Sequence, residues 1–412
     1  MTKYGRSPWV EEFPASRVPS YPTHRAPLKT GAVVVGGGLT GALSAYALAA
    51  AGVKVVLLEA NRIGRGTTAY SSGWIAGDPG VSFADVEQAM GLRSARRGWQ
   101  AWRRAALDFT ALLRRLDIKC HLEESDSALV AAAADHVARL KRDQKARVAA
   151  GIEAPALTAR AIKRELSLEG AAGVRSKGGG TIDPYRACVG LVAAAADRNA
   201  LIFEKSPVQR IKFTRRTIDV FTRGGKIRAE RVVIATGLPG TLFKALARHF
   251  WFHTTYLVLT HSIPAKIRRS IAPSAEASRI VVRDGAAPPH VIRWMDEDRV
   301  LIAGADTELA PRQRDKILVQ RTGQLMYELS TLYPEVSGIQ PTYGWSADYV
   351  RTADGLPYIG AHRNYPFHLF AFGDSSHSVT GSYLASRILL RQYSGELDPA
   401  DEVFGFHRTL VR

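Results

Sequence analysis

The chain has 412 residues, of which 46% are hydrophobic and 23% are charged, and this composition indicates a globular and not a disordered protein. A chain of this length suits two interleaved domains better than one simple core. The formal net charge is +18 at pH 7, but Lys and Arg are scattered without the interleaved aromatic residues of a single-strand-binding groove, so nucleic acid is not favoured as a partner.

The N-terminal segment, residues 1–28, is rich in Pro and charge and has no apolar stretch of the signal-peptide type. No apolar run reaches the roughly 18 to 20 residues of a membrane span. We therefore expect an extended arm on a cytoplasmic protein without a membrane span. The cysteines Cys120 and Cys188 form no CxxC pair, which argues against a dithiol redox centre and a thiolate metal cluster; no metal site is predicted.

The next predicted elements lie in the stretch AVVVGGGLTGALSAYALAAAGVKVVLLEANRIGRG, residues 32–66. It begins as a short buried strand, and Gly36, Gly38 and Gly41 follow in GxGxxG spacing at the start of a helix. The first glycine permits a tight turn, the second lets the backbone approach a pyrophosphate, and the third lets helix and strand pack closely. The helix N-terminus adds N–H groups and a partial positive charge for the phosphates. This pattern predicts a dinucleotide site.

A second strand, over residues 54–58, ends in Glu59, whose carboxylate can accept hydrogen bonds from both ribose hydroxyls of an adenosine and would repel a 2′-phosphate. The segment ERVVIATG, residues 230–237, reads as a further apolar strand, and the segment from Leu369 reads as strand, loop and helix. Such segments close a flavin domain, and no second strand–GxGxxG–helix unit is present for a nicotinamide. The sequence therefore predicts FAD, reduced by a substrate.

Other elements are expected between these segments. Residues 83–116 have apolar side chains at helical spacing and read as an amphipathic packing helix. Residues 249–264 and 290–306 alternate like strands of an antiparallel sheet, and a helix is expected over 312–333. These segments are assigned to a substrate domain.

Taken together, these motifs resemble the FAD-dependent D-amino acid oxidase and glycine oxidase superfamily, which includes sarcosine oxidases and gamma-glutamylputrescine oxidase. The resemblance covers nearly the whole chain from about Lys29. It rests on GGGLTG with Glu59, RIGRGTTAYSSG, TIDPYRACVGLVAAA with EKSPVQRI, ATG, TADGLPYIG and GDSSHSVTGS. It implies an α/β fold, a Rossmann-like FAD-binding domain interleaved with an α+β substrate domain built on an antiparallel sheet plus helices.

The expected domain boundaries follow from the order of the segments. The FAD-binding domain is assembled from residues 29–80, 165–245 and 345–412. The substrate domain consists of residues 81–164, which are expected to be mostly helical, and residues 246–344, which are expected to be mostly strands.

The resemblance also implies which residues contact FAD. The predicted set is Gly36, Gly38, Leu39, Thr40 and Gly41 at the pyrophosphate; Glu59, Ala60 and Arg62 around the adenosine; Thr67 and Thr68 beside the flavin ring; Val208 at the adenine; Ala235 and Gly237 at the cofactor tunnel; and Gly373, Asp374, Ser378, Val379 and Thr380 at the pyrimidine edge.

The chain departs from the family where the substrate should bind. In the family's amino acid oxidases, an arginine before the DGxPxxG motif clamps the substrate carboxylate. In WSADYVRTADGLPYIG that position is Tyr349, and Arg351 stands two residues on, on the same strand face but roughly 6 to 7 Å away. An amine without an α-carboxylate, or with its acid group farther away, is therefore expected to be preferred, unless Arg351 or Arg293 reaches the cavity.

Further candidates for the substrate site come from the final loop and from the predicted sheet. The loop GDSSHSVTG carries serines and His377 where relatives have several glycines, and His377 could tune the flavin, bind substrate or do neither. His253, Tyr256, His261, His290 and Arg293 could point into a cavity beneath the sheet, although most residues of this kind serve packing or solvent.

The resulting hypothesis is an FAD-dependent oxidoreductase that oxidises the C–N bond of a small amine or amino acid. A hydride would pass to flavin N5, the imine would hydrolyse, and oxygen or another acceptor would take the electrons. Two alternatives stay open: a flavoenzyme that acts on a modified RNA base, which the positive charge would suit, and an FAD-bearing subunit without catalysis of its own.

Overall fold

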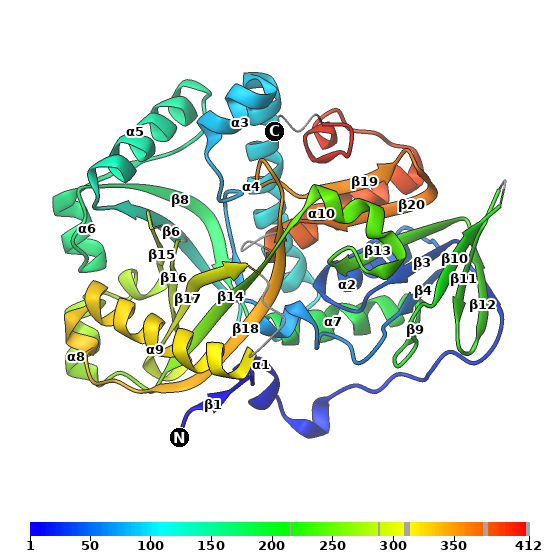
Figure 1. The fold of residues 1–412 in the computed structure, drawn as a ribbon, viewed down its shortest axis with the longest axis horizontal. Helices are drawn as coiled ribbons and strands as arrows, with labels where there is room; N and C mark the ends of the chain where they lie inside the picture. The colour runs from blue at the N-terminus through cyan, green and yellow to red at the C-terminus, as the bar shows by residue number, and fades with distance from the viewer. Residues whose placement is uncertain (215, 287–288, 309–313, 374–377, 409–412) are drawn as a thin grey trace.

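A computed structural model describes the chain except residues 215, 287–288, 309–313, 374–377 and 409–412 (Figure 1). The fold is mixed α/β. A mostly parallel sheet with its helices occupies one end of the long axis, and a large, mostly antiparallel sheet occupies the other (Figure 1).

The parallel sheet contains the glycine-rich turn. Its strand order is β19-β20-β13-β3-β4-β9, and only the β19–β20 pair is antiparallel. The strands are β3 (Ala32–Val35), β4 (Val55–Leu58), β9 (Leu201–Phe203), β13 (Arg231–Gly237), β19 (Tyr358–His362) and β20 (Tyr365–Phe372). Short apolar runs such as AVVV form these strands because parallel strands are covered on both faces.

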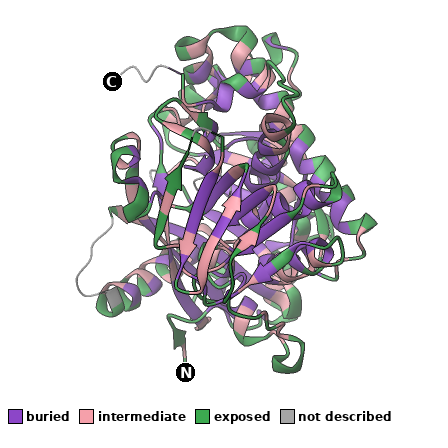
Figure 2. Cartoon of the chain, turned by 90° about the vertical axis from the view of Figure 1, so that its right-hand side faces the viewer, coloured by how far each residue is buried: buried purple, intermediate pink, exposed green. Residues whose placement is uncertain are grey.

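Both faces of the parallel sheet are covered by other elements. Val34 packs toward the helices α2 (Leu39–Ala50), α7 (Pro184–Ala196) and α10 (Ser378–Ser394), whereas Val33 and Val35 pack toward a small sheet. The small sheet has the order β10-β11-β12-β2, with β2 (Leu28–Lys29), β10 (Arg210–Phe213), β11 (Ile218–Thr222) and β12 (Gly225–Ala229). Buried residues accordingly gather in the central strands, with exposed residues on the outer helices and loops (Figure 2).

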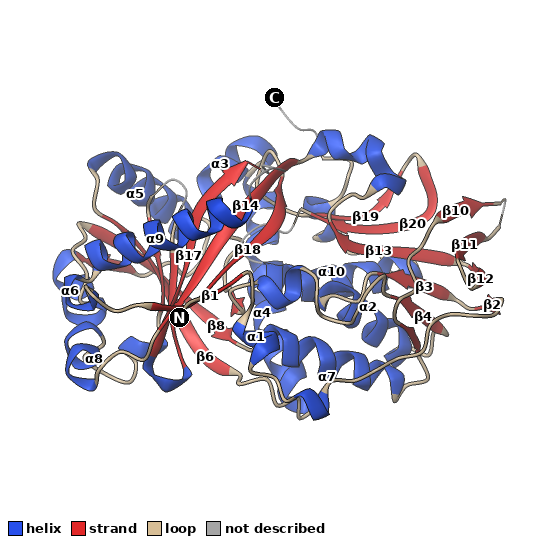
Figure 3. Ribbon diagram, turned by 60° about the horizontal axis from the view of Figure 1, so that its bottom comes forward, coloured by secondary structure: helices blue, strands red, loops and turns tan. Residues whose placement is uncertain are grey.

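The large sheet has the order β1-β18-β14-β17-β16-β15-β6-β8-β5, with β7 paired to β8. Its strands are β1 (Lys3–Tyr4), β5 (Trp74–Ile75), β6 (Glu123–Ala131), β7 (Ala156–Thr158), β8 (Ala172–Thr181), β14 (Trp251–Thr260), β15 (Val281–Asp284), β16 (Val291–Met295), β17 (Arg299–Glu308) and β18 (Pro341–Arg351). One face packs against α9 (Arg314–Leu332), and the other turns toward the parallel-sheet half (Figure 3). The strands β14 and β16 fall within the two segments whose alternation predicts strands, β17 begins in the second segment and extends two residues beyond its end, and α9 falls within the predicted helix 312–333.

The remaining helices lie around the large sheet and at the junction with the parallel sheet. They are α3 (Phe83–Met90), α4 (Leu92–Arg115), α5 (Ala134–Ala149), α6 (Ala159–Leu166) and α8 (Ala265–Ile271). The single helix predicted over 83–116 is wrong in one respect: Gly91, with φ of +82°, ends α3 and begins α4. A left-handed residue cannot continue a right-handed helix, so the chain turns there.

The N-terminal segment is more structured than the expected extended arm. It contains α1 (Pro8–Glu11), its strand β1 pairs with β18, and β2 pairs with β12. Trp9 is buried with an exposed fraction of 5% and donates from its indole nitrogen to the Ser71 carbonyl at 2.9 Å. An apolar anchor in the arm thus holds it against the body of the protein.

Sheet membership cuts across the expected domain boundaries. Strand β8 lies in a segment assigned to the FAD-binding domain, and β18 reaches into another, yet both belong to the large sheet. The division into domains therefore stays a prediction. None of the helices in the described residues has the length and apolar character to cross a bilayer.

Candidate active site

The turn between β3 and α2 requires glycine at two positions. Gly36 has a φ of +108°, and a Cβ atom there would lie 2.4 Å from the Ala235 carbonyl oxygen on the neighbouring strand β13. A Cβ atom on Gly41 would lie 1.8 Å from the Gly36 carbonyl oxygen. Side chains at either position would push strand, turn and helix apart, so the glycines keep this backbone close to the space above the turn.

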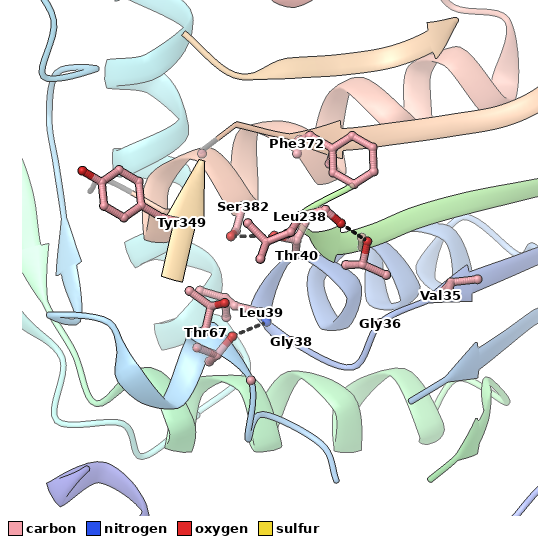
Figure 4. Close-up of a pocket in the computed structure, with 18 of the residues that line it drawn as sticks. Val35, Gly36, Gly38, Leu39, Thr40, Thr67, Leu238, Tyr349, Phe372 and Ser382 are labelled. Atoms are coloured by element: carbon pink, nitrogen blue, oxygen red, sulfur yellow. Dashed lines mark hydrogen bonds between the residues drawn. The ribbon is translucent and has the colours of Figure 1, made fainter. Parts of the chain in front are cut away.

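The N-terminus of α2 opens on that space. Its N-cap residue is Gly38, which offers no side-chain acceptor to the first turn. Instead, Thr68, in the short 3-10 helix η2 (Thr67–Tyr70), accepts a hydrogen bond from the Leu39 N–H at 2.8 Å. The Thr40 hydroxyl lies 2.8 Å from the Ser382 hydroxyl of α10. The turn thus keeps a positive dipole end for an anion and ties it to two other segments (Figure 4).

Glu59 is held at the end of β4 by backbone N–H groups. Its Oε2 accepts from the Gly37 N–H at 2.7 Å and its Oε1 from the Asn61 N–H at 2.7 Å. A carboxylate has about four lone-pair sites, so this arrangement fixes the side chain and leaves acceptor capacity for hydroxyl groups.

These groups line a cavity of about 320 Å³, which we call the first cavity. Its walls come from the glycine turn, the end of β4, η2, the end of β13, β18 and α10 (Figure 4). The predicted FAD-contact residues that line it are Gly36, Gly38, Leu39, Thr40, Glu59, Ala60, Thr67, Thr68, Val208, Ala235, Gly237 and Val379.

The other residues of the predicted set do not line the first cavity. Gly41 packs beneath the turn, and the Arg62 guanidinium pairs with buried Glu204 at 3.0 Å. Thr380 is fully buried and donates to the Ala76 carbonyl at 2.9 Å. Gly373, at the end of β20, is also absent from the lining. Asp374 and His377 lie outside the described residues, as does the side chain of Ser378.

A second cavity of about 130 Å³ adjoins the first. The two share Thr67, Ser71 and Tyr349 as wall residues. Two hydrogen bonds hold the segment that contains Ser71. The Trp9 indole nitrogen donates to the Ser71 carbonyl oxygen at 2.9 Å, and the Trp345 indole nitrogen donates to the Tyr70 carbonyl oxygen at 3.1 Å. A ligand in the second cavity would therefore meet a ligand in the first at a rigid junction.

Tyr349 is the aromatic side chain among the three shared residues of this junction. Its hydroxyl donates to Asp306 Oδ2, and its ring stacks on His253 with 5.7 Å between centroids. Burial raises the pKa of Tyr349, and the negative charge of Asp306 raises it further. The phenol therefore stays protonated at neutral pH and acts as a hydrogen-bond donor.

Arg351 and Arg283 also line the second cavity. Arg351 lies at its outer end, because it also lines a larger outer cavity of about 630 Å³ that includes Trp251 and His253. Arg283 is buried and contacts both oxygens of Asp78 at 3.2 Å, with its guanidinium over the Trp74 ring.

The remaining candidates do not line the first or second cavity. Arg293 shares a face of β16 with Val291, which lines the second cavity, but its guanidinium donates to the Gly73 carbonyl at 2.9 Å. Tyr256 faces α9, and its hydroxyl contacts Thr307.

Two of the histidine candidates are also absent from the walls of the second cavity. His290 lies between Asp284 and Glu328, at 2.5 and 2.8 Å, and His261 is exposed.

Several wall residues were not foreseen from the sequence. In the second cavity they include Tyr70, Ser71, Ser72, Thr255, Leu257, Arg283, Pro289 and Asp306; in the first they include Leu238, Asp348, Phe372, Gly381 and Ser382. Some of these residues could have been predicted from the sequence, since Ser71 and Ser72 follow the predicted Thr67–Thr68 loop. Asp306 closes the stretch 290–306, which the alternation already predicted as strands.

A sequence model of the family described as FAD dependent oxidoreductase matches residues 32–392. The chain belongs to this family. FAD is therefore its cofactor, and the chain is an enzyme. The geometry of the first cavity also fits FAD, independently of the family match. It combines a backbone that only glycine permits, a helix N-terminus for the phosphates and a fixed carboxylate for hydroxyl groups.

Individual relatives are similar over most of their length. Gamma-glutamylputrescine oxidoreductase of Escherichia coli is 26% identical over 372 residues, which cover 89% of this chain and 84% of that protein. Glycine oxidase of Bacillus licheniformis is 23% identical over 389 residues, covering 87% and 92%. The crystal structure of glycine oxidase from Geobacillus kaustophilus has a TM-score of 0.74 at 21% identity and covers 95% of this chain and 99% of that one, which shows the shared fold.

Proposed function

We propose that this FAD-dependent oxidoreductase oxidises the C–N bond of a small amine or amino acid at the junction of the two cavities. The observation that carries the proposal is the second cavity, which is small, borders the first cavity at Thr67, Ser71 and Tyr349, and contains charged groups of both signs. The relatives named above include an enzyme for gamma-glutamylputrescine and one for glycine, which supports an amino compound as substrate.

The proposed FAD contacts follow the lining of the first cavity. Gly36, Gly38, Leu39 and Thr40 would hold the pyrophosphate, and Glu59 with Ala60 and Val208 would hold the adenosine. Thr67, Ala235, Gly237 and Val379 would lie along the rest of the cofactor. The absence of Arg62 from the lining favours Glu59 alone as the charged group near the adenosine.

When bound, FAD supplies the acceptor for the hydride that leaves the carbon next to the substrate nitrogen. The chain's own part is to hold that carbon at the junction and to keep water out, which orientation and burial achieve without a catalytic dyad. The substrate ammonium must lose a proton first, because only the neutral amine has the lone pair that forms the C=N bond. The imine then reacts with water to give a carbonyl compound and ammonia or a smaller amine, and oxygen or another acceptor takes the two electrons.

Anaerobic mixing of the FAD-loaded protein with a panel of amines, ω-amino acids and α-amino acids tests the proposal. We expect at least one member to bleach the long-wavelength flavin band, with one equivalent of carbonyl product per flavin. Dithionite reduction confirms that the bound flavin is competent. A flavin that dithionite reduces but no member of the panel reduces would refute the proposal and favour an FAD-bearing subunit or a substrate of another class.

A further inference from the structure

Asp306 faces the second cavity, and among the described residues its carboxylate accepts one hydrogen bond, from the Tyr349 hydroxyl. It is half-buried on β17. Within the described part of the chain, no basic side chain forms an ion pair with it. Arg351 and Arg283 line the same cavity, but Arg283 contacts Asp78 and neither contacts Asp306.

The backbone is distorted in a way that aims Asp306 at this cavity. On β17, Leu301 and Ala303 face the cavity side of the sheet, so regular alternation would turn Ala305 to that side and Asp306 toward α9. The β14–β17 register instead shifts between Thr254 and Tyr256, and Ala305 adopts a φ of +52°. This bulge reverses the alternation: Ala305 packs under α9 and Asp306 lines the cavity.

The bulge costs free energy in the protein alone, and the half-buried carboxylate is only partly compensated there. A non-glycine residue at positive φ is strained, and a carboxylate removed from water is destabilised unless a cation or several donors compensate. Tyr349 supplies one donor. A cationic group in the cavity would supply the missing compensation.

The opposite charge lies toward the mouth. Arg351 stands two residues beyond Tyr349 on the same face of β18, roughly 6 to 7 Å along the strand, where the second cavity meets the outer cavity. Among the described residues, no acidic side chain forms an ion pair with Arg351. The second cavity thus has a negative group beside the junction residue Tyr349 and a positive group at its outer end.

We infer that Asp306 binds the ammonium group of the substrate and that Arg351 binds an anionic group several ångströms farther out. The substrate class is then an ω-amino acid or an amine with a distal acid group, and not a simple α-amino acid. This inference rests on the proposed function and names the substrate class for the same site. Tyr349 is a positioning residue, because it orients the Asp306 carboxylate through their hydrogen bond.

The test uses FAD-loaded protein and three kinds of probe: the series glycine, β-alanine, γ-aminobutyrate and δ-aminovalerate; butylamine; and butyrate. Dissociation constants come from the change in the flavin spectrum on binding and from the substrate dependence of anaerobic reduction. We expect wild-type protein to bind γ-aminobutyrate or δ-aminovalerate at least about tenfold more tightly than glycine.

Three variants separate the two charges. Asp306→Asn should weaken butylamine binding by about 10- to 100-fold, the range for loss of a hydrogen bond to a charged group, and leave butyrate binding unchanged. Arg351→Gln should weaken butyrate and leave butylamine unchanged. Glu308→Gln removes a charge from an exposed position two residues along β17 and should change neither.

A pH profile separates binding from a merely structural effect. Because Asp306 stabilises the bound ammonium, Asp306→Asn should lower the pKa of that ammonium and move the rise in flavin reduction rate to lower pH. Should Asp306→Asn fail to fold, Tyr349→Phe keeps the carboxylate, removes its donor, and should weaken butylamine binding by a smaller factor, about 3- to 10-fold.

These experiments distinguish a failure of the Asp306 and Arg351 assignments from a failure of the proposed function. If butylamine reduces wild-type flavin and Asp306→Asn or, failing that, Tyr349→Phe binds it with the wild-type constant, the assignment of Asp306 is overturned. Preference for glycine over the longer members would overturn the proposed spacing. If no amino compound reduces the wild-type flavin, the proposed function itself fails.

Discussion

Replacement of Gly36 by alanine tests whether the glycine turn shapes the FAD cavity. A φ of +108° costs an alanine about 1–2 kcal/mol. The new Cβ atom would also lie 2.4 Å from the Ala235 carbonyl oxygen, and an overlap of this kind costs about 1–3 kcal/mol when a backbone must move. The sum is about 2–5 kcal/mol.

The overlap, unlike the strain of the positive φ, is relieved if β3 and β13 separate, but Ala235 lines the first cavity, so FAD binding must restore the overlap. Since about 1.4 kcal/mol corresponds to a factor of ten, the overlap of about 1–3 kcal/mol in Gly36→Ala should weaken FAD binding by about 5-fold to 150-fold. The assay is titration of apoprotein with FAD, followed by flavin fluorescence, together with thermal unfolding of the apoprotein.

Gly52→Ala is the matched control. Gly52 has a φ of +80°, but nothing lies within 4 Å of its Cβ position, so this variant carries the backbone strain, about 1–2 kcal/mol, without the overlap. It should bind FAD with the wild-type constant. If Gly36→Ala also binds FAD normally and unfolds at the same temperature as Gly52→Ala, the contact with Ala235 does not shape the cavity and the reasoning is refuted.

Three further predictions follow from buried groups. Burial lowers the pKa of His290, but its two carboxylate neighbours outweigh this and raise the pKa from 6.5 to about 9. The protonated histidine therefore stabilises the folded protein by about 3 kcal/mol. This contribution is complete below about pH 6.5 and is lost as the pH rises to about 9. The unfolding temperature should fall over this window, and His290→Gln should abolish that dependence; an unchanged pH dependence in the variant would contradict the assignment. Burial raises the pKa of Cys120 to about 12 and also raises that of Cys188, so a thiol reagent at about pH 8 should modify both thiols only after unfolding, and rapid labelling of the folded protein would show that they are accessible. Burial lowers the pKa of Arg293 to about 10. Because its charge is costly to bury, Arg293→Met should change the free energy of unfolding by less than about 2 kcal/mol, and it should leave amine binding unchanged. Tenfold weaker amine binding would instead indicate that Arg293 contacts the substrate.

The glycine turn, the two strands beside it and Glu59 were predictable because their signal is local. Strand β3, the turn and α2 follow one another directly, and a side chain is excluded at Gly41 by the turn itself and at Gly36 by the neighbouring strand β13. The sequence accordingly predicted Gly36, Gly38, Leu39, Thr40 and Glu59, which line the first cavity, but not Val35 and Leu58, which also line it.

The sequence did not predict which side chains of the large sheet point to which of its two faces. Alternation identified β14 as a strand, but both faces are buried: Tyr256 packs under α9, and Leu257 faces the second cavity. Since each face offers apolar contacts, the sequence pattern cannot say which face meets the cofactor half of the protein. Tyr256 was therefore a candidate for the cavity, whereas Thr255 and Leu257 line it.

The sequence by itself determined the family, the cofactor and the position of the nucleotide turn, because these depend on short-range spacing. Only the tertiary structure decided that Tyr349 meets Asp306 and that Arg351, not Arg293, reaches the second cavity. Those contacts depend on the register between strands far apart in the chain and on a bulge at Ala305. A shift of one residue in a strand turns a side chain to the opposite face, so the charges that would select the substrate are set by how the strands pair.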